Sequence, residues 1–270
     1  MFSGYNYQVV YVTASVFCGR LTAAVNNFTV GKLPETKELN KTKDNYMFTP
    51  TVIAKIKSPY SGKFGIPRQS GMVNCVSEVV FEKPYNNIDA VRGIEEFSHI
   101  WLIWYFDKSD DKASSLTVRP PKLGGNVRVG VFASRSPFRP NPIGLTLVKL
   151  VKVNAEGKKL SLTVEGADLL DGTPILDIKP YLPFSESLTD AIGGFSETTS
   201  KVRLYVDFPD NLIKKIDEDK RLAVKNLLSL DPRPGYQNDA ERIYGVTYYD
   251  YNIKFRTDGK TLYVTEVEIV

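Results

Sequence analysis

The chain has 270 residues, 42% of them hydrophobic, and 35 Lys and Arg against 31 Asp and Glu give it a net charge of +4. This size allows one large core, or one core with a small satellite domain, and so mild a charge does not by itself indicate nucleic-acid binding. Two cysteines and one histidine exclude a disulfide framework and argue against a metal site held by the protein. Sparse thiols, and no early apolar run long enough to span a bilayer, predict a soluble cytoplasmic protein.

The first 46 residues differ in character from the rest of the chain. After an early apolar run, the stretch Lys37–Asn45 is polar, alternates in charge and has no hydrophobic period. Met47 stands immediately before the first strand-like run. Residues 1–46 are therefore interpreted as an N-terminal extension of uncertain status: either a real extension or residues upstream of the true start.

Residues 47–208 have a mainly β pattern of short apolar or alternating runs, which predicts an antiparallel β-barrel. The stretch Asn154–Lys158 is the clearest hairpin turn, in which Gly157 is free to adopt a positive φ. The eight expected strands are Val52–Ile56, Val73–Phe81, Ile100–Phe106, Val127–Phe132, Leu145–Val153, Leu160–Val164, Ile175–Tyr181 and Val202–Phe208.

Residues 209–270 change period and are expected to form a small α+β domain. Apolar positions between Leu212 and Leu230 follow a helical spacing, with Asp210 as a possible cap and prolines beyond the end. A hairpin is expected between Ile243–Phe255 and Thr261–Val270, which Asp258-Gly259 joins.

Most candidate ligand-binding residues lie in proline- and glycine-rich loops that carry positive charge. Guanidinium groups on a stiff backbone suit bidentate binding of carboxylate or phosphate. The alternative is that these loops are only the rim of the barrel and that their arginines contact water rather than a ligand. The loop Phe64–Gly71 again holds a Pro-Arg pair, and Asp168–Tyr181 adds three carboxylates around a Gly-Thr-Pro turn. The cations of the densest stretch, between Val118 and Gly144, are Arg119, Lys122, Arg128, Arg135 and Arg139.

These residues alone leave two functions open. A methyltransferase needs groups that hold a cationic cofactor in line with a weak nucleophile, and arginines with carboxylates serve that purpose. The same residues suit a non-catalytic module that binds RNA or a nucleotide. No glycine-rich dinucleotide fingerprint or phosphate-binding loop is present to favour another class.

Six motifs follow one another along the chain: Ser58-Pro-Tyr, Lys63-Phe-Gly-Ile-Pro-Arg-Gln, Phe97-Ser-His-Ile-Trp, Val118-Arg-Pro-Pro-Lys-Leu-Gly-Gly-Asn, Arg135-Ser-Pro-Phe-Arg-Pro-Asn-Pro-Ile-Gly and Asp168-Leu-Leu-Asp-Gly-Thr-Pro-Ile-Leu-Asp-Ile-Lys-Pro-Tyr. In this order they resemble the TsaA-like family of β-barrel tRNA methyltransferases, over about residues 52–195. The motif Asp231-Pro-Arg-Pro-Gly-Tyr also resembles the small C-terminal domain of bacterial members.

The resemblance implies a barrel enzyme that uses S-adenosylmethionine to methylate N6 of threonylcarbamoyladenosine, 3′ of the anticodon in the tRNA anticodon stem-loop. It also implies a homodimer. The composition of the chain, by itself, predicts neither a membrane partner nor a metal. The alternatives are a non-catalytic binding module and a methyltransferase acting on another substrate. Cofactor contacts are expected at Pro67, Arg68, Gln69, Phe106, Asp107, Arg135, Leu145, Glu165, Gly166, Ala167 and Asp168.

Other roles are expected from residue type. Asp168 and Asp171 are the candidates nearest the transferring methyl group, and Asp107 departs from the His that relatives often have there. His99 is interpreted as structural, whereas Tyr60, Phe138 and Tyr181 are candidates for stacking on bases. The expected RNA contacts are Arg119, Lys122, Arg128, Arg139 and Tyr181.

Overall fold

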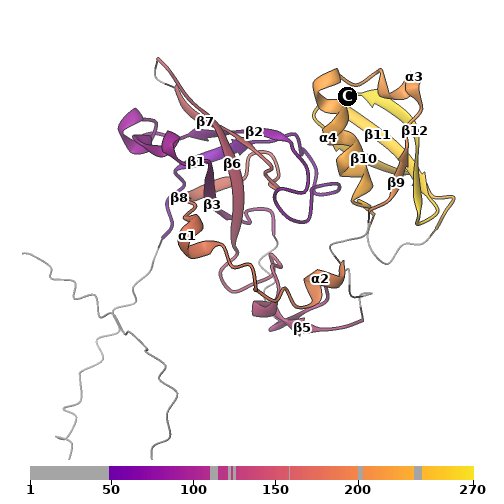
Figure 1. The fold of residues 1–270 in the computed structure, drawn as a ribbon, viewed down its shortest axis with the longest axis horizontal. Coiled ribbons are helices and arrows are strands. Elements are labelled where there is room, and N and C mark those ends of the chain that lie inside the picture. The colour runs from indigo at the N-terminus through magenta and orange to yellow at the C-terminus, as the bar shows by residue number, and fades with distance from the viewer. Residues whose placement is uncertain are drawn as a thin grey trace, which may run out of the picture. The chain divides into compact units, whose positions relative to one another are not determined.

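The computed structural model describes residues 49–109, 115–120, 123, 126–157, 159–199, 203–233 and 239–270. Residues 49–270 belong to one compact unit, which Figure 1 shows with its labelled elements. Residues 1–46, for which the sequence leaves two interpretations, lie outside the described part of the chain. None of the described helices is long and apolar enough to cross a membrane.

Six strands close into an antiparallel barrel in the order β1-β2-β7-β6-β3-β8, which confirms the expected fold class. Alternate side chains point inward because successive residues of a strand face opposite sides. On the third strand the inward residues Ile100, Leu102 and Trp104 are buried. The barrel strands are β1 (Ala54–Lys57), β2 (Val76–Phe81), β3 (His99–Tyr105), β6 (Ile143–Glu156), β7 (Lys159–Glu165) and β8 (Pro174–Pro180).

The expectation that all eight runs are barrel strands is wrong for two of them. The run Val127–Phe132 forms only β5 (Val129–Gly130), which pairs with β4 (Thr117–Val118) in a separate two-stranded sheet. Only Val131 of this run is buried, so there is no inward-facing row to complete the barrel. The run Val202–Phe208 forms β9 (Tyr205–Asp207) in the C-terminal sheet, because Leu204 and Phe208 are buried in the core of that sheet.

The β6–β7 hairpin turns where the sequence predicts. Gly157 adopts φ +61°, a conformation that L side chains rarely take. Short elements link the strands elsewhere: the 3₁₀ turns η1 (Ile88–Val91), η2 (Ile94–Glu96) and η4 (Val131–Ala133), and the helices α1 (Pro183–Glu186) and α2 (Phe195–Thr199).

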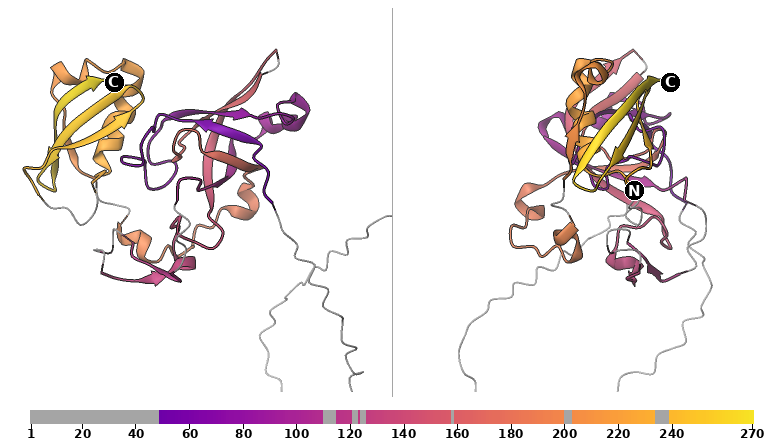
Figure 2. Two further views of the ribbon diagram at one scale, coloured as in Figure 1. Left: turned by 180° about the vertical axis from the view of Figure 1, so that it is seen from behind. Right: turned by 90° about the vertical axis from the view of Figure 1, so that its right-hand side faces the viewer.

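The C-terminal sheet has the order β10-β11-β12-β9, and β9 runs parallel to β12. The expected hairpin around Asp258-Gly259 joins β11 to β12, but its first arm is itself two strands that turn at Tyr249-Asp250. Helices pack on one face of this sheet (Figure 2). The strands are β10 (Tyr244–Tyr248), β11 (Tyr251–Thr257) and β12 (Thr261–Ile269).

The single amphipathic helix expected from Leu212 to Leu230 is wrong, because the chain forms α3 (Asp210–Ile213) and α4 (Glu218–Ser229). Asp217 between them is extended, and the Nε of Arg221 donates to the carbonyls of Ile213 and Ile216. The Ile213 carbonyl also accepts the Ile216 N–H, so the bonds from Arg221 connect α4 to the end of α3 and to the turn between the helices, which stabilises the break.

Candidate functional site

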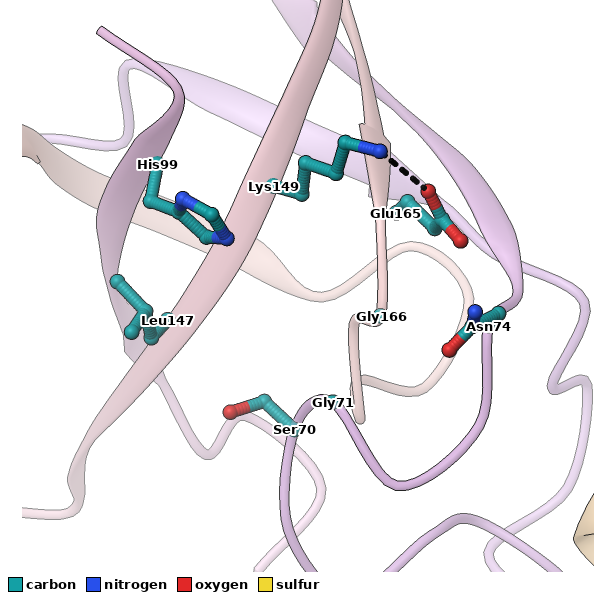
Figure 3. A pocket seen from close by; sticks show the side chains of 8 residues that line it. All are labelled: Ser70, Gly71, Asn74, His99, Leu147, Lys149, Glu165 and Gly166. Carbon is teal, nitrogen blue, oxygen red and sulfur yellow. Dashed lines mark ion pairs between the residues drawn. The ribbon is translucent and has the colours of Figure 1, made fainter.

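Two hollows are lined in part by the same two stretches of chain, the loop 63–71 and the segment 165–170. The first, here called the polar pocket, has a volume of about 310 Å³, and Figure 3 shows it from close by. Lys149 on β6 and Glu165 at the end of β7 form an ion pair of 3.5 Å on its rim. The polar pocket is lined by Ser70, Gly71, Asn74, His99, Leu147, Lys149, Glu165 and Gly166.

The second hollow, here called the aromatic pocket, has a volume of about 330 Å³. Both volumes fall at the lower end of the range of small-molecule and cofactor sites. The rings of Trp104 and Phe106 lie 4.1 Å apart between centroids and form one wall. The aromatic pocket is lined by Lys63, Ile66, Trp104, Phe106, Asp107, Lys108, Ser109, Pro137, Phe138, Asp168, Leu170 and Thr173.

Asp168 is held in the aromatic pocket by a chain of hydrogen bonds from inside the barrel. The indole Nε1 of Trp104 donates to the hydroxyl of Thr146 at 3.0 Å, and that hydroxyl donates to Asp168 Oδ1 at 2.8 Å. Burial raises the pKa of the Asp168 carboxyl, while the bond from Thr146 and the charge of Arg135 oppose the rise. The result is a fixed carboxylate that is costly to keep ionised and suited to a cationic partner.

Arg135 joins the two loops that flank the aromatic pocket. Its Nη1 donates to Gln69 Oε1 at 2.6 Å and links the loop 63–71 to the loop that carries Pro137 and Phe138. Neither side chain lines either pocket, but both are exposed, so the guanidinium keeps donors for a ligand. The structure thus brings together Gln69, Arg135 and Asp168, which the sequence places far apart.

Phe106 and Asp107 also reach this pocket, and Glu165 and Gly166 reach the polar one. The Asp107 carboxylate lies 3.3 Å from Lys108 Nζ. Leu145 is half exposed on the outer face of β6 and lines neither pocket.

Four other expected residues make contacts within the protein. Pro67 is buried, and the buried Ala167 accepts a bond from the Cys75 thiol through its carbonyl. The Nη2 of Arg68 donates to the carbonyl of Arg233 at 3.3 Å, and burial lowers its pKa. Asp171 lines neither pocket and accepts a bond from the Ser58 backbone N–H at 2.9 Å.

The expected RNA contacts are spread over the loops. Arg119 is exposed, Arg128 donates to Thr117 Oγ1 at 2.9 Å, and Arg139 donates to the Ser134 carbonyl at 3.1 Å. The ring of Tyr181 lies edge-on to Trp101 at 6.1 Å between centroids. Lys122 lies outside the described residues.

One stacking candidate is wrong. Tyr60 is 1% exposed and packs edge-on against Tyr248 of the C-terminal sheet, so its ring cannot stack on a base. Phe138, in contrast, is 47% exposed and lines the aromatic pocket. His99 begins β3 with its Nδ1 2.9 Å from Ser98 Oγ and lines the polar pocket, a more open place than a core histidine occupies.

Sequence reasoning missed Trp104, Thr146 and Lys149. A usable signal existed for Thr146, because it is a polar residue at an inward position of a strand whose other inward residues are apolar or glycine. No such signal marks Lys149, whose place in the polar pocket depends on the register of β6 against β7. Among the described residues, no three His, Cys, Asp or Glu side chains gather as a metal site.

Comparisons with known proteins agree with this architecture. Residues 55–187 match the family described as tRNA-methyltransferase O N-terminal domain, and residues 201–270 match the TrmO C-terminal domain. An Escherichia coli protein named tRNA (adenine(37)-N6)-methyltransferase is 43% identical over 213 residues, which is 76% of this chain and 91% of that protein. A protein of the same name from Eikenella corrodens is 45% identical over 163 residues, 60% of this chain and 92% of that protein.

The crystal structure of TrmO from Pseudomonas aeruginosa superposes with a TM-score of 0.66 at 28% identity, and covers 82% of this chain and 98% of that one. The barrel and its flanking pockets therefore define a barrel-type methyltransferase fold rather than a dinucleotide-binding fold. The chain belongs to the TrmO family, which confirms the resemblance that its motifs indicate.

Proposed function

We propose that this protein transfers a methyl group from S-adenosylmethionine to N6 of adenosine 37 in tRNA, and that its target is N6-threonylcarbamoyladenosine. The observation that carries the reaction is the 43% identity to the E. coli tRNA (adenine(37)-N6)-methyltransferase across most of both chains. The threonylcarbamoyl group rests on the motif resemblance alone.

The residues present fit the cofactor. The apolar walls of the aromatic pocket suit an adenine ring, the exposed donors of Arg135 suit a carboxylate, and the Asp168 carboxylate suits a cationic or hydroxyl group. S-adenosylmethionine supplies an electrophilic methyl group on a sulfonium. We assign its recognition to Gln69, Phe106, Asp107, Arg135 and Asp168, with Pro67, Arg68, Leu145 and the stretch 165–167 as further contacts.

At the reacting centre, the acceptor nitrogen forms a bond to the methyl carbon as the carbon–sulfur bond breaks and its electron pair remains on sulfur. The nitrogen then loses its proton. Its carbamoyl substituent delocalises the lone pair, so alignment contributes more than strong base catalysis. We assign that proton to Asp168, because burial raises the pKa of its carboxyl and the Thr146 bond fixes its position. We assign Asp171 a structural part instead.

We further propose that the tRNA anticodon stem-loop binds through Arg119, Lys122, Arg128, Arg139 and Tyr181, that the enzyme acts as a homodimer, and that it works in the cytoplasm. We place the division between the barrel domain and the C-terminal domain before β9 rather than at residue 208, because β9 pairs with β12 and the match to the C-terminal domain begins at residue 201. Sedimentation analysis of the full chain tests the dimer directly.

The test of the proposed reaction uses purified protein, S-adenosylmethionine and tRNA that carries threonylcarbamoyladenosine. Mass spectrometry of anticodon fragments should gain one methyl group, and calorimetry should show S-adenosylhomocysteine binding that Arg135→Ala weakens by about tenfold or more. Binding without methylation of any tRNA would favour another substrate, and no cofactor binding would favour the non-catalytic module. Methylation of unmodified adenosine 37 at an equal rate would remove the threonylcarbamoyl group from the proposal.

A further inference from the structure

The loop that joins β1 to β2, residues 58–75, determines the shape of both pockets. Lys63 and Ile66 line the aromatic pocket, whereas Ser70 and Asn74 line the polar pocket. This loop also carries Gln69, the partner of Arg135. No helix or strand is formed between Lys57 and Val76, so the loop has no ladder of its own and its conformation depends on neighbouring elements.

The C-terminal sheet supplies much of that support by packing. Tyr60, Val73 and Cys75 of the loop are buried in the same hydrophobic core as α4 and the C-terminal strands, and Phe64 and Ile66 pack against it. Gly65 adopts φ +90°, and a Cβ placed there would lie 2.0 Å from Val246 Cγ2 of β10. The loop therefore approaches β10 so closely that only glycine fits.

Tyr249, at the turn between β10 and β11, holds both ends of the loop. Its backbone N–H donates to the Pro59 carbonyl at 2.8 Å, and its hydroxyl donates to the Val76 carbonyl at 3.0 Å. Pro59 is near the start of the loop, and Val76 comes directly after its end. One residue of the C-terminal sheet thus closes the loop across its base.

A second contact holds the middle of the loop. The Nη2 of Arg68 donates to the Arg233 carbonyl, and the corner that presents this carbonyl is fixed by Asp231. The Asp231 carboxylate accepts bonds from Arg233 Nε at 2.8 Å and from Arg233 Nη2 at 2.9 Å. Such a bidentate pair has well-defined geometry, and Arg233 is only 7% exposed.

We infer that the C-terminal sheet is part of the cofactor-binding apparatus, because Tyr249 and the Asp231–Arg233 corner hold the loop 58–75 in the conformation that forms the two pockets. Tyr249 is a positioning residue, since it lines neither pocket and acts through the loop. The inference rests on the cofactor site proposed above. It gives the C-terminal domain a role that does not require it to touch tRNA.

The test compares Tyr249→Phe with Tyr263→Phe in the full chain. The hydroxyl of Tyr263 donates to Asp258 Oδ2 at 3.1 Å within the C-terminal sheet, so its removal deletes a similar bond without touching the loop. Tyr249→Phe should raise the Kd for S-adenosylhomocysteine about two- to tenfold, the change expected from one lost hydrogen bond. Tyr263→Phe should leave that Kd unchanged.

Further measurements separate positioning from general destabilisation. Tyr249→Phe should speed amide hydrogen exchange in residues 62–75 and raise the KM for S-adenosylmethionine, with kcat at saturating cofactor and the KM for tRNA unchanged. Asp231→Asn, which removes the charge from the corner, should raise the same KM. A higher KM for tRNA with an unchanged Kd for S-adenosylhomocysteine in both variants would overturn the inference and make the C-terminal sheet a tRNA-binding element.

The two proposals fail in different ways. If the wild-type protein binds S-adenosylhomocysteine and Arg135→Ala weakens it, the proposed cofactor site stands. If Tyr249→Phe and Asp231→Asn then bind as tightly as the wild type, only the role of the C-terminal sheet is overturned.

Discussion

The polar pocket and the aromatic pocket share two stretches of chain but present opposite chemistry. Glu165 and Gly166 line the first, and Asp168 and Leu170 line the second, so a few residues of one segment serve both. The polar pocket holds an exposed ion pair, whereas the aromatic pocket holds a carboxylate that is partly withdrawn from water. Most of the binding free energy should therefore come from the aromatic pocket, because charges away from water interact more strongly.

Of all the variants, Gly144→Ala should have the strongest effect, because it disturbs a wall of the aromatic pocket. A Cβ on Gly144 would lie 2.2 Å from Trp104 Cε2, so Gly144→Ala must displace the indole that forms one wall. Overpacking of this kind lowers the free energy of unfolding by about 1 to 3 kcal/mol. Denaturant unfolding should show the loss of stability, and calorimetry with S-adenosylhomocysteine should show a loss of affinity. Gly130→Ala is the control, because nothing lies within 4 Å of its added Cβ; equal behaviour of the two variants would refute the explanation.

Asp168→Asn should reduce methyl transfer by about tenfold to a hundredfold, because the amide still accepts the Thr146 bond but has no negative charge for a cationic ligand group and takes up no proton. The same substitution should raise the stability of the folded protein rather than lower it. Burial raises the pKa of Asp168 in the folded protein, so the wild type loses stability as the pH rises from the usual pKa of aspartate to that higher value. The variant should therefore show the higher Tm near pH 8, and the gain should shrink as the pH is lowered.

Asp171→Asn is the matched control for Asp168→Asn. Its carboxylate lines neither pocket and accepts the Ser58 N–H, a bond that an amide oxygen can also accept. Thermal scans at several pH values and single-turnover methylation should leave it close to the wild type. Similar losses of methylation in the two variants would mean that Asp171 also takes part in catalysis.

Phe138→Ala should weaken binding about two- to tenfold, the usual value of one aromatic contact. Phe138 lies on the aromatic pocket and is 47% exposed, so its ring is accessible to an adenine. Titration with S-adenosylhomocysteine and steady-state kinetics with tRNA will show whether the ring contacts the adenine of the cofactor or the target adenine of the tRNA. Phe132→Ala is the control, since Phe132 is 75% exposed and lines neither pocket.

The smallest effect is expected in the polar pocket. Lys149→Met breaks an ion pair in which the lysine side chain is 59% exposed, and pairs of this kind contribute about 0.2 to 1 kcal/mol. The Kd for S-adenosylhomocysteine should change less than about threefold. A change above tenfold would reverse the comparison and place the ligand carboxylate beside Lys149 rather than Arg135.

Much of the barrel could be predicted from sequence because its inward rows are apolar at every second residue, as on β3 and β7. The pattern wrongly predicts barrel strands at Val127–Phe132 and Val202–Phe208, because a short apolar run does not reveal which sheet it joins. In the site, Gln69, Arg135 and Asp168 were found through motifs. The Thr146 bond, the Arg68 contact with Arg233 and the part of Lys149 depend on strand register and on packing between distant segments, which no local pattern encodes.

Trp104 makes the intrinsic fluorescence of the protein sensitive to the aromatic pocket. The chain contains two tryptophans, and this one lines the aromatic pocket with its indole N–H bonded to Thr146. Trp101, the other, faces outward on β3 and donates to Glu186 instead. Intrinsic fluorescence therefore contains a built-in optical reporter beside the proposed ligand and a second emitter on the other face of the same strand. With Trp101→Phe, emission comes from Trp104 alone, and occupancy of the aromatic pocket can be followed without any label.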